Sequence, residues 1–190
     1  MLMDPLAWLG VRKERSHLAA LHAEIRRLLP EDESVVIRYM VVVAVLLTRV
    51  AHADGRVYDS ERERLAALFR HTDRLPPDRI ESLCKLLDEQ VPKMSANEID
   101  TCYTQLRSLC NAEERLQVVR LLARQATADG EIHVEEHAAL FEVATALGVT
   151  GEILEEIEID ALAEERARLG TALPDDSHDT SDAGDETAPR

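Results

Sequence analysis

The chain has 190 residues, a length typical of one compact domain, and its 45% hydrophobic residues suffice for a core without disulfides or a structural metal. A formal net charge of −15 would repel a phosphate backbone or an anionic membrane surface, and an aromatic content of 3% leaves few platforms for base stacking. These values argue against a nucleic-acid partner and favour an acidic, soluble, helical protein.

Apolar residues recur at intervals of three and four along the chain, which is the period of an amphipathic helix. The pattern predicts helices over 12–28, 33–53, 59–72, 77–91, 96–109, 113–128, 134–147 and 151–168. The longest apolar run, residues 39–47, is shorter than the roughly 20 residues that span a bilayer, so it predicts a buried helix and no membrane span. No stretch indicates a strand. We therefore expect an all-α fold, a compact bundle of about seven to eight helices.

The two ends of the chain differ from its middle. We expect an N-terminal helical extension over 1–29, the main helical domain over 30–169 and an acidic tail over 170–190. Its stretch from Pro174 to Arg190 lacks large apolar residues and is rich in Asp, so it cannot bury enough surface to offset its ordering entropy, and we expect the tail to be disordered.

The cysteines and the N-terminal sequence bear on the compartment. The chain has three cysteines, an odd number with no CxxC pair, which is untypical of a secreted disulfide framework. Residues 1–10 lack the basic start and long apolar run of a signal peptide. We expect a cytoplasmic protein.

The chain contains an internal repeat at an offset of 75 residues, relating residues 41–69 to 116–147. Each copy is a long apolar helix, a tight corner and a second helix opened by an acidic residue. The corners read ADGRVYDSE at 53–61 and ADGEIHVEE at 128–136, so both fit A-D-G-x-[VI]-x-x-x-E. Two such helical hairpins facing each other would bury a shared core.

The corner has a structural and a chemical interpretation. Gly55 and Gly130 suit the left-handed position just past a helix end, and a Glu in the following first turn is favoured by the helix dipole. Alternatively, the order Asp, Gly, branched apolar residue and Glu matches the second half of a calcium-binding EF-hand loop, whose first half has no counterpart here. If the corners converge, their four carboxylates would share a calcium-like divalent cation or form an acidic cleft. These four candidate metal ligands are Asp54, Glu61, Asp129 and Glu136.

One motif points to an enzyme. His133, Glu136 and His137 fit H-x-x-E-H, in which two imidazoles hold zinc and the Glu acts as general base. The corner position of His133 and the absence of the motif from the first copy weaken this interpretation. No other catalytic motif is found, so we expect a non-enzymatic protein, with a zinc-dependent hydrolase as a remote alternative.

The two corners, each preceded by LL-x-R-x-A, resemble the TerB (tellurite-resistance protein B) superfamily over about residues 30–150. The resemblance implies an all-helical cytoplasmic domain associated with tellurite resistance and stress responses. It also implies that the acidic corner residues Asp54, Glu61, Asp129 and Glu136 bind metal. Related domains occur fused to J-domain co-chaperones, so a chaperone system is one expected kind of partner.

A further alternative is a purely structural or interaction scaffold. Its acidic surface, including residues 152–165, would dock a basic partner or a loop of a membrane protein. The competing interpretation of the same stretch is the solvated face of an amphipathic helix. The oligomeric state is not predicted.

Overall fold

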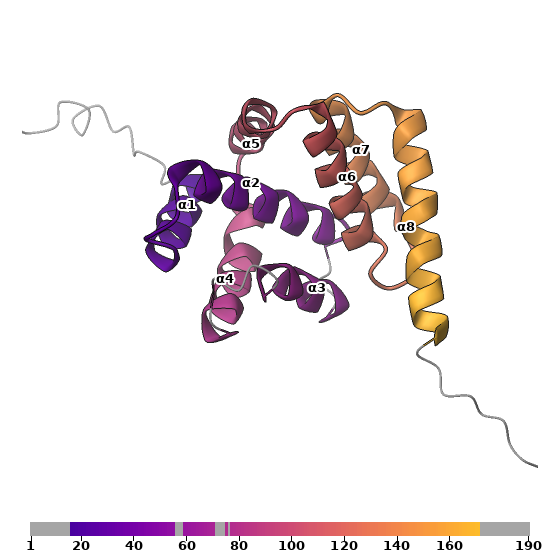
Figure 1. Ribbon diagram of the computed structural model, residues 1–190, viewed down its shortest axis with the longest axis horizontal. Coiled ribbons are helices and arrows are strands. Elements are labelled where there is room, and N and C mark those ends of the chain that lie inside the picture. Colours follow the sequence, from indigo (N-terminus) through magenta and orange to yellow (C-terminus); the bar gives the residue numbers. More distant parts are fainter. Residues whose placement is uncertain (1–15, 56–58, 71–74, 76, 172–190) are drawn as a thin grey trace, which may run out of the picture.

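In the computed structural model, residues 16–55, 59–70, 75 and 77–171 are described, with the backbone alone for 59–61, 68 and 171 (Figure 1). This part of the chain is helical throughout and contains no strand, which confirms the all-α prediction. The helices are α1 (His17–Leu28), α2 (Ser34–Ala51), α3 (Asp59–Arg70), α4 (Pro77–Gln90), the short 3-10 helix η2 (Val91–Lys93), α5 (Ala96–Leu109), α6 (Ala112–Ala126), α7 (Val134–Leu147) and α8 (Gly151–Thr171). Residues 172–190 of the predicted disordered tail and residues 12–15 of the predicted first helix lie outside the described residues, whereas residues 170 and 171, assigned to the tail, are the last two residues of α8.

Helix α2 occupies the centre of the fold. It packs against α1, α3, α4, α5, α6 and α7, and Figure 1 shows it running between α5 and α6 on one side and α3 and α4 on the other. Nearly every residue from Val41 to Ala51 is buried, because the segment is apolar on all faces. By length and a mean hydropathy of 2.0, α2 is also the one described helix that meets the criteria for a membrane span. Its 61% buried residues are typical of a core helix, as the sequence predicted.

The two long helices of the repeat, α2 and α6, lie against each other, and α7 packs on both. Helix α3 contacts α4, α2 and α6, while α8 lies on the outside against α6 and α7. The core is one continuous cluster that includes Leu21, Leu46, Leu87, Leu106 and Leu140, each fully buried. The two helical hairpins therefore share one core.

Candidate functional site: the two Ala-Asp-Gly corners

The same turn is built at both corners. Helix α2 ends at Ala51 and α6 ends at Ala126, and the next residue in each case donates its N–H to the carbonyl four residues earlier, at 3.0 Å. Gly55 then donates to His52 O at 3.1 Å, and Gly130 donates to Thr127 O at 2.9 Å. Their φ angles are +76° and +93°, so both glycines adopt the left-handed conformation that the sequence predicted. The backbone of the corner thus recurs at the 75-residue offset.

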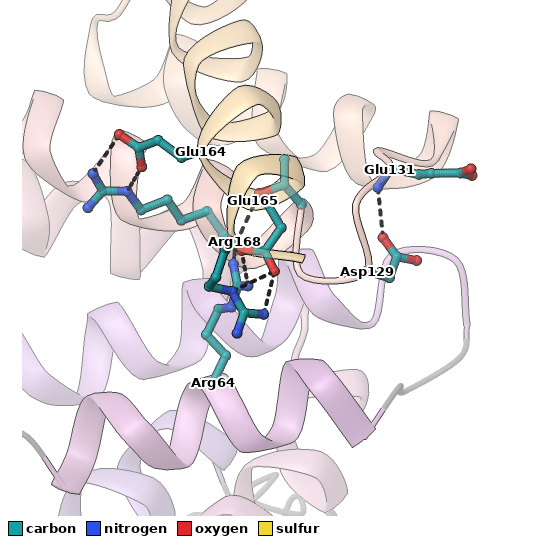
Figure 2. Close-up of polar contacts among 8 residues, drawn as sticks. Arg64, Asp129, Glu131, Glu164, Glu165 and Arg168 are labelled. Carbon is teal, nitrogen blue, oxygen red and sulfur yellow. Dashed lines mark hydrogen bonds and ion pairs between the residues drawn. The ribbon is translucent and has the colours of Figure 1, made fainter. Parts of the chain in front are cut away.

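At the second corner, Asp129 supports the turn itself. Its Oδ1 accepts a hydrogen bond from the Glu131 N–H at 3.1 Å, which Figure 2 shows as a dashed line. Its Oδ2 lies 3.4 Å from Nε2 of His133, four residues further along the corner. About a third of each of these two side chains is exposed. Asp129 is therefore held on the surface of the corner by local contacts, an arrangement known as an Asx turn.

Glu136 is directed into the protein. Only 3% of the residue is exposed, and its Oε2 accepts a hydrogen bond from the His133 N–H at 2.9 Å, closing a capping box at the start of α7. The carboxylate thus satisfies a backbone donor that has no partner within the helix. This contact gives Glu136 a structural role at the beginning of α7.

At the first corner the description is partial. Asp54 is partly buried, and Glu61 belongs to α3 but its side chain lies outside the described residues. Among the side chains that the structure describes, no three or more His, Cys, Asp or Glu gather closely enough to hold a metal ion. The predicted cation site shared by all four acids remains a prediction.

The three residues of the H-x-x-E-H motif contact three different groups. His133 is the N-cap of α7 and faces Asp129, while Glu136 caps the same helix. His137 Nδ1 lies 2.8 Å from Glu158 Oε1 on α8. A zinc site of the predicted kind would require both imidazoles to leave their acidic partners and Glu136 to leave the helix terminus. In the described geometry the motif joins the corner, α7 and α8.

The arginines that precede the corners pair with neighbouring helices. Arg49 Nη2 lies 2.8 Å from Glu142 Oε2 on α7, and Arg124 Nε lies 3.0 Å from Glu164 Oε2 on α8. In these two ion pairs the arginines contact α7 and α8 and not a corner carboxylate. Each arginine lies one helical turn before its corner, and its side chain reaches the neighbouring helix, from α2 to α7 for Arg49 and from α6 to α8 for Arg124.

A buried ion-pair cluster next to the second corner was not predicted. Glu165 on α8 is 6% exposed and is contacted by Arg64 of α3, at 2.6 Å, and by Arg168 (Figure 2). Burial opposes ionisation of Glu165, but the hydrogen bonds from Arg168 and Arg64 outweigh it and lower its pKa. Arg64 also donates to the carbonyl of Arg124 at the end of α6. The cluster fastens α3 to α6 and α8.

The same helix corrects the expectation for the acidic stretch 152–165. Glu158 is 8% exposed and pairs with His137, and Glu165 is also buried, so these two acids are not on a solvated face. The sequence carries a signal for this: both follow the spacing of Leu154 and Ala161, which form the buried stripe of α8. Exposed acids do remain on α8, at Glu152, Glu155, Glu156, Asp160 and Glu164, the last of which pairs with Arg124.

Comparison with known proteins yields one match. The family model described as tellurite resistance protein TerB matches residues 40–159, well over half of the chain and both corners. The match confirms the family suggested by the A-D-G-x-[VI]-x-x-x-E corners. No curated protein and no solved structure matches the chain.

Proposed function

Because the chain belongs to the TerB family, we propose that it is a non-enzymatic, cytoplasmic helical domain that serves tellurite resistance or a stress response by binding a protein partner. One observation supports this most directly. The corner residues best suited to chemistry are committed to the fold, with Glu136 buried as a helix cap and the two imidazoles of His133 and His137 held by carboxylates. At the second corner these three side chains are therefore already engaged in contacts that hold the fold together.

The exposed acids of α8 are the proposed docking surface. Glu152, Glu155 and Glu156 lie in the first turns of a helix that packs on the body through its opposite stripe, so their carboxylates face solvent. A basic segment would complement them, and a loop of a membrane protein or a chaperone component fits that description. Such charge pairing mainly accelerates association and sets specificity.

The test is complementation of a strain that lacks the gene, scored by survival in tellurite. We expect the wild-type chain to restore survival and the triple variant Glu152→Lys, Glu155→Lys, Glu156→Lys to fail while remaining folded by circular dichroism. The matched control is Glu81→Lys, Glu89→Lys, a charge reversal on α4, which should complement. Full complementation by the α8 variant would refute the proposed surface.

A second candidate function is weak divalent-cation binding at the second corner. The favouring observation is that Asp129 and His133 are exposed side by side, since a carboxylate and an imidazole 3.4 Å apart would both ligate an ion placed between them. Two protein ligands predict low affinity, with water completing the shell. Calorimetry with calcium, manganese and zinc should detect binding that Asp129→Ala abolishes and Asp78→Ala leaves intact. Binding indifferent to Asp129→Ala, or none at millimolar ion, would eliminate this candidate.

A further inference from the structure

The segment that precedes α1 is rich in apolar residues. The large apolar residues within residues 1–15 are Met1, Leu2, Met3, Leu6, Trp8, Leu9 and Val11. They are followed by Arg12, Lys13 and Arg15, with Glu14 among them. Exposing this many large apolar side chains to water is unfavourable, by roughly 25 cal/mol for each Å² of apolar surface. Such a segment is stabilised when it covers another apolar surface.

The structure fixes where this segment meets the body. Glu98 Oε1, in the first turn of α5, accepts hydrogen bonds from Ser16 Oγ at 2.8 Å and from the Leu18 N–H at 3.0 Å. His17 Nδ1 lies 2.8 Å from Oε1 of Gln90, the last residue of α4. The beginning of α1 is therefore held at the junction between α4 and α5, which is where η2 lies.

A groove of about 540 Å³ opens at the same junction. It lies between η2, the end of α2 and α7, and we call it the η2–α7 groove. Its apolar lining comes from Ala53, Val91, Pro92, Met94, Ala138 and Ala139. The charged lining consists of Glu135, Glu142 and Arg49, and His52 lines the groove as well. Arg49 pairs with Glu142 at 2.8 Å, so the exposed Glu135 supplies the net negative charge of these three residues.

We propose that residues 1–15 dock into the η2–α7 groove of their own chain, with Trp8 against the apolar lining and the basic residues near Glu135 and Glu142. The reach is sufficient, since the eight residues from Trp8 to Ser16 span up to about 28 Å when extended. A short tether also raises the effective concentration of the segment to the order of millimolar, so modest contacts hold it in place. The sign of the charges agrees, because residues 12–15 carry three basic side chains against one acid, and Glu135 gives the groove a net negative charge once Arg49 is paired with Glu142.

Trp8 is the one tryptophan of the chain and reports directly on docking. In the full-length protein we expect its emission at shorter wavelength, and its quenching by acrylamide weaker, than in a synthetic peptide of residues 1–15. Adding urea should bring both values to those of the peptide. The proposal would be overturned if Trp8 of the folded full-length protein had the same emission wavelength and the same acrylamide quenching as Trp8 of the peptide.

Paired variants locate the docking site. Ala138→Arg places a bulky cation in the groove and should shift the Trp8 emission towards that of the peptide. Ala67→Arg makes the same change at an exposed position of α3, outside the groove, and should leave the emission unchanged. Glu135→Lys provides a second groove variant if Ala138→Arg loses helicity by circular dichroism. Insensitivity of Trp8 to both groove variants would overturn the proposal.

Other occupants of the groove and other sites for the segment give distinct results. Docking into a second copy would make the Trp8 emission depend on protein concentration and produce a dimer by analytical ultracentrifugation. If the segment docked at the exposed Val35 and Tyr39 of α2 instead, Val35→Arg would shift the Trp8 emission towards that of the peptide, and Ala138→Arg would not. Insertion into lipid would appear as a blue shift of Trp8 only when anionic vesicles are added. Each of these results contradicts docking within the chain.

Discussion

Removing the charge of Glu98 should weaken either the capping box of α5 or the contact between α1 and α5, because this carboxylate serves both. Its Oε2 accepts from the N–H and hydroxyl of Ser95, closing the capping box of α5, while its Oε1 accepts from Ser16 and Leu18 at the start of α1. Glu98→Gln preserves the shape of the side chain but retains one acceptor oxygen of the two. One of these two pairs of hydrogen bonds is therefore lost.

The pKa of Glu98 gives the magnitude. Burial alone would raise the pKa, but the hydrogen bonds from Ser95, Leu18 and Ser16 outweigh burial and lower it from 4.5 to about 2. A shift of this size corresponds to about 3 kcal/mol for a fully shielded group, at about 1.4 kcal/mol per pKa unit. Because Glu98 is partly exposed, solvent screening reduces this to about 1 to 2 kcal/mol.

The sign of the pH dependence follows from the lowered pKa. The contribution of Glu98 to the free energy of unfolding is fully present above pH 4.5, the pKa of this carboxyl in the unfolded chain. As the pH falls from 4.5 towards about 2, the unfolded chain takes up the proton more readily than the folded protein, so this contribution is lost. Urea unfolding of wild type and Glu98→Gln should therefore differ by about 1 to 2 kcal/mol at pH 7 and converge near pH 2.

Glu114→Gln is the matched control for Glu98→Gln. Glu114 closes the capping box of α6 through Asn111, three residues earlier in the sequence. Since this contact is local, its loss should cost less, about 0.5 to 1 kcal/mol. Equal stability of wild type and Glu98→Gln at pH 7 would refute the reasoning. A difference that stays constant down to pH 2 would refute it as well.

Three further predictions concern the corner, the buried ion pair and the thiols. Gly130→Ala should lower the free energy of unfolding by about 1 to 2 kcal/mol in urea titration, because φ is +93° there. Arg64→Ala should cost about 2 kcal/mol, since it leaves buried Glu165 with one cation fewer, whereas removal of the more exposed Arg168 should cost less than 1 kcal/mol. Equal losses would contradict this order. Burial raises the pKa of the Cys102 thiol to about 12, so native protein at pH 8 should resist iodoacetamide there until urea is added, by mass spectrometry.

The helices and the corner backbones were predictable from the sequence because their determinants are local. Periodic apolar residues placed the eight helices, and the 75-residue offset placed Gly55 and Gly130 in matching left-handed turns. Caps and turn glycines act within a few residues, so a single sequence contains the information for them.

The contacts of the candidate site were not predictable in the same way. Ser16 and Glu98 lie 82 residues apart, and Arg64 meets Glu165 only because α3 and α8 pack at the end of α6. Glu136 was expected either to ligate an ion or to complement a helix terminus, and the spacing alone did not separate the two. Glu136 is a helix cap in the structure because it is buried, and its burial depends on how α7 packs against the rest of the fold.

The central position of α2 has a consequence for how the domain unfolds. Since this helix belongs to the first hairpin and yet forms core contacts with α5, α6 and α7, neither half of the repeat can open without exposing it. The two copies of the sequence repeat are therefore not two units that unfold independently. The two halves should melt as a single cooperative unit, and the amide protons of α2 should exchange only through global unfolding.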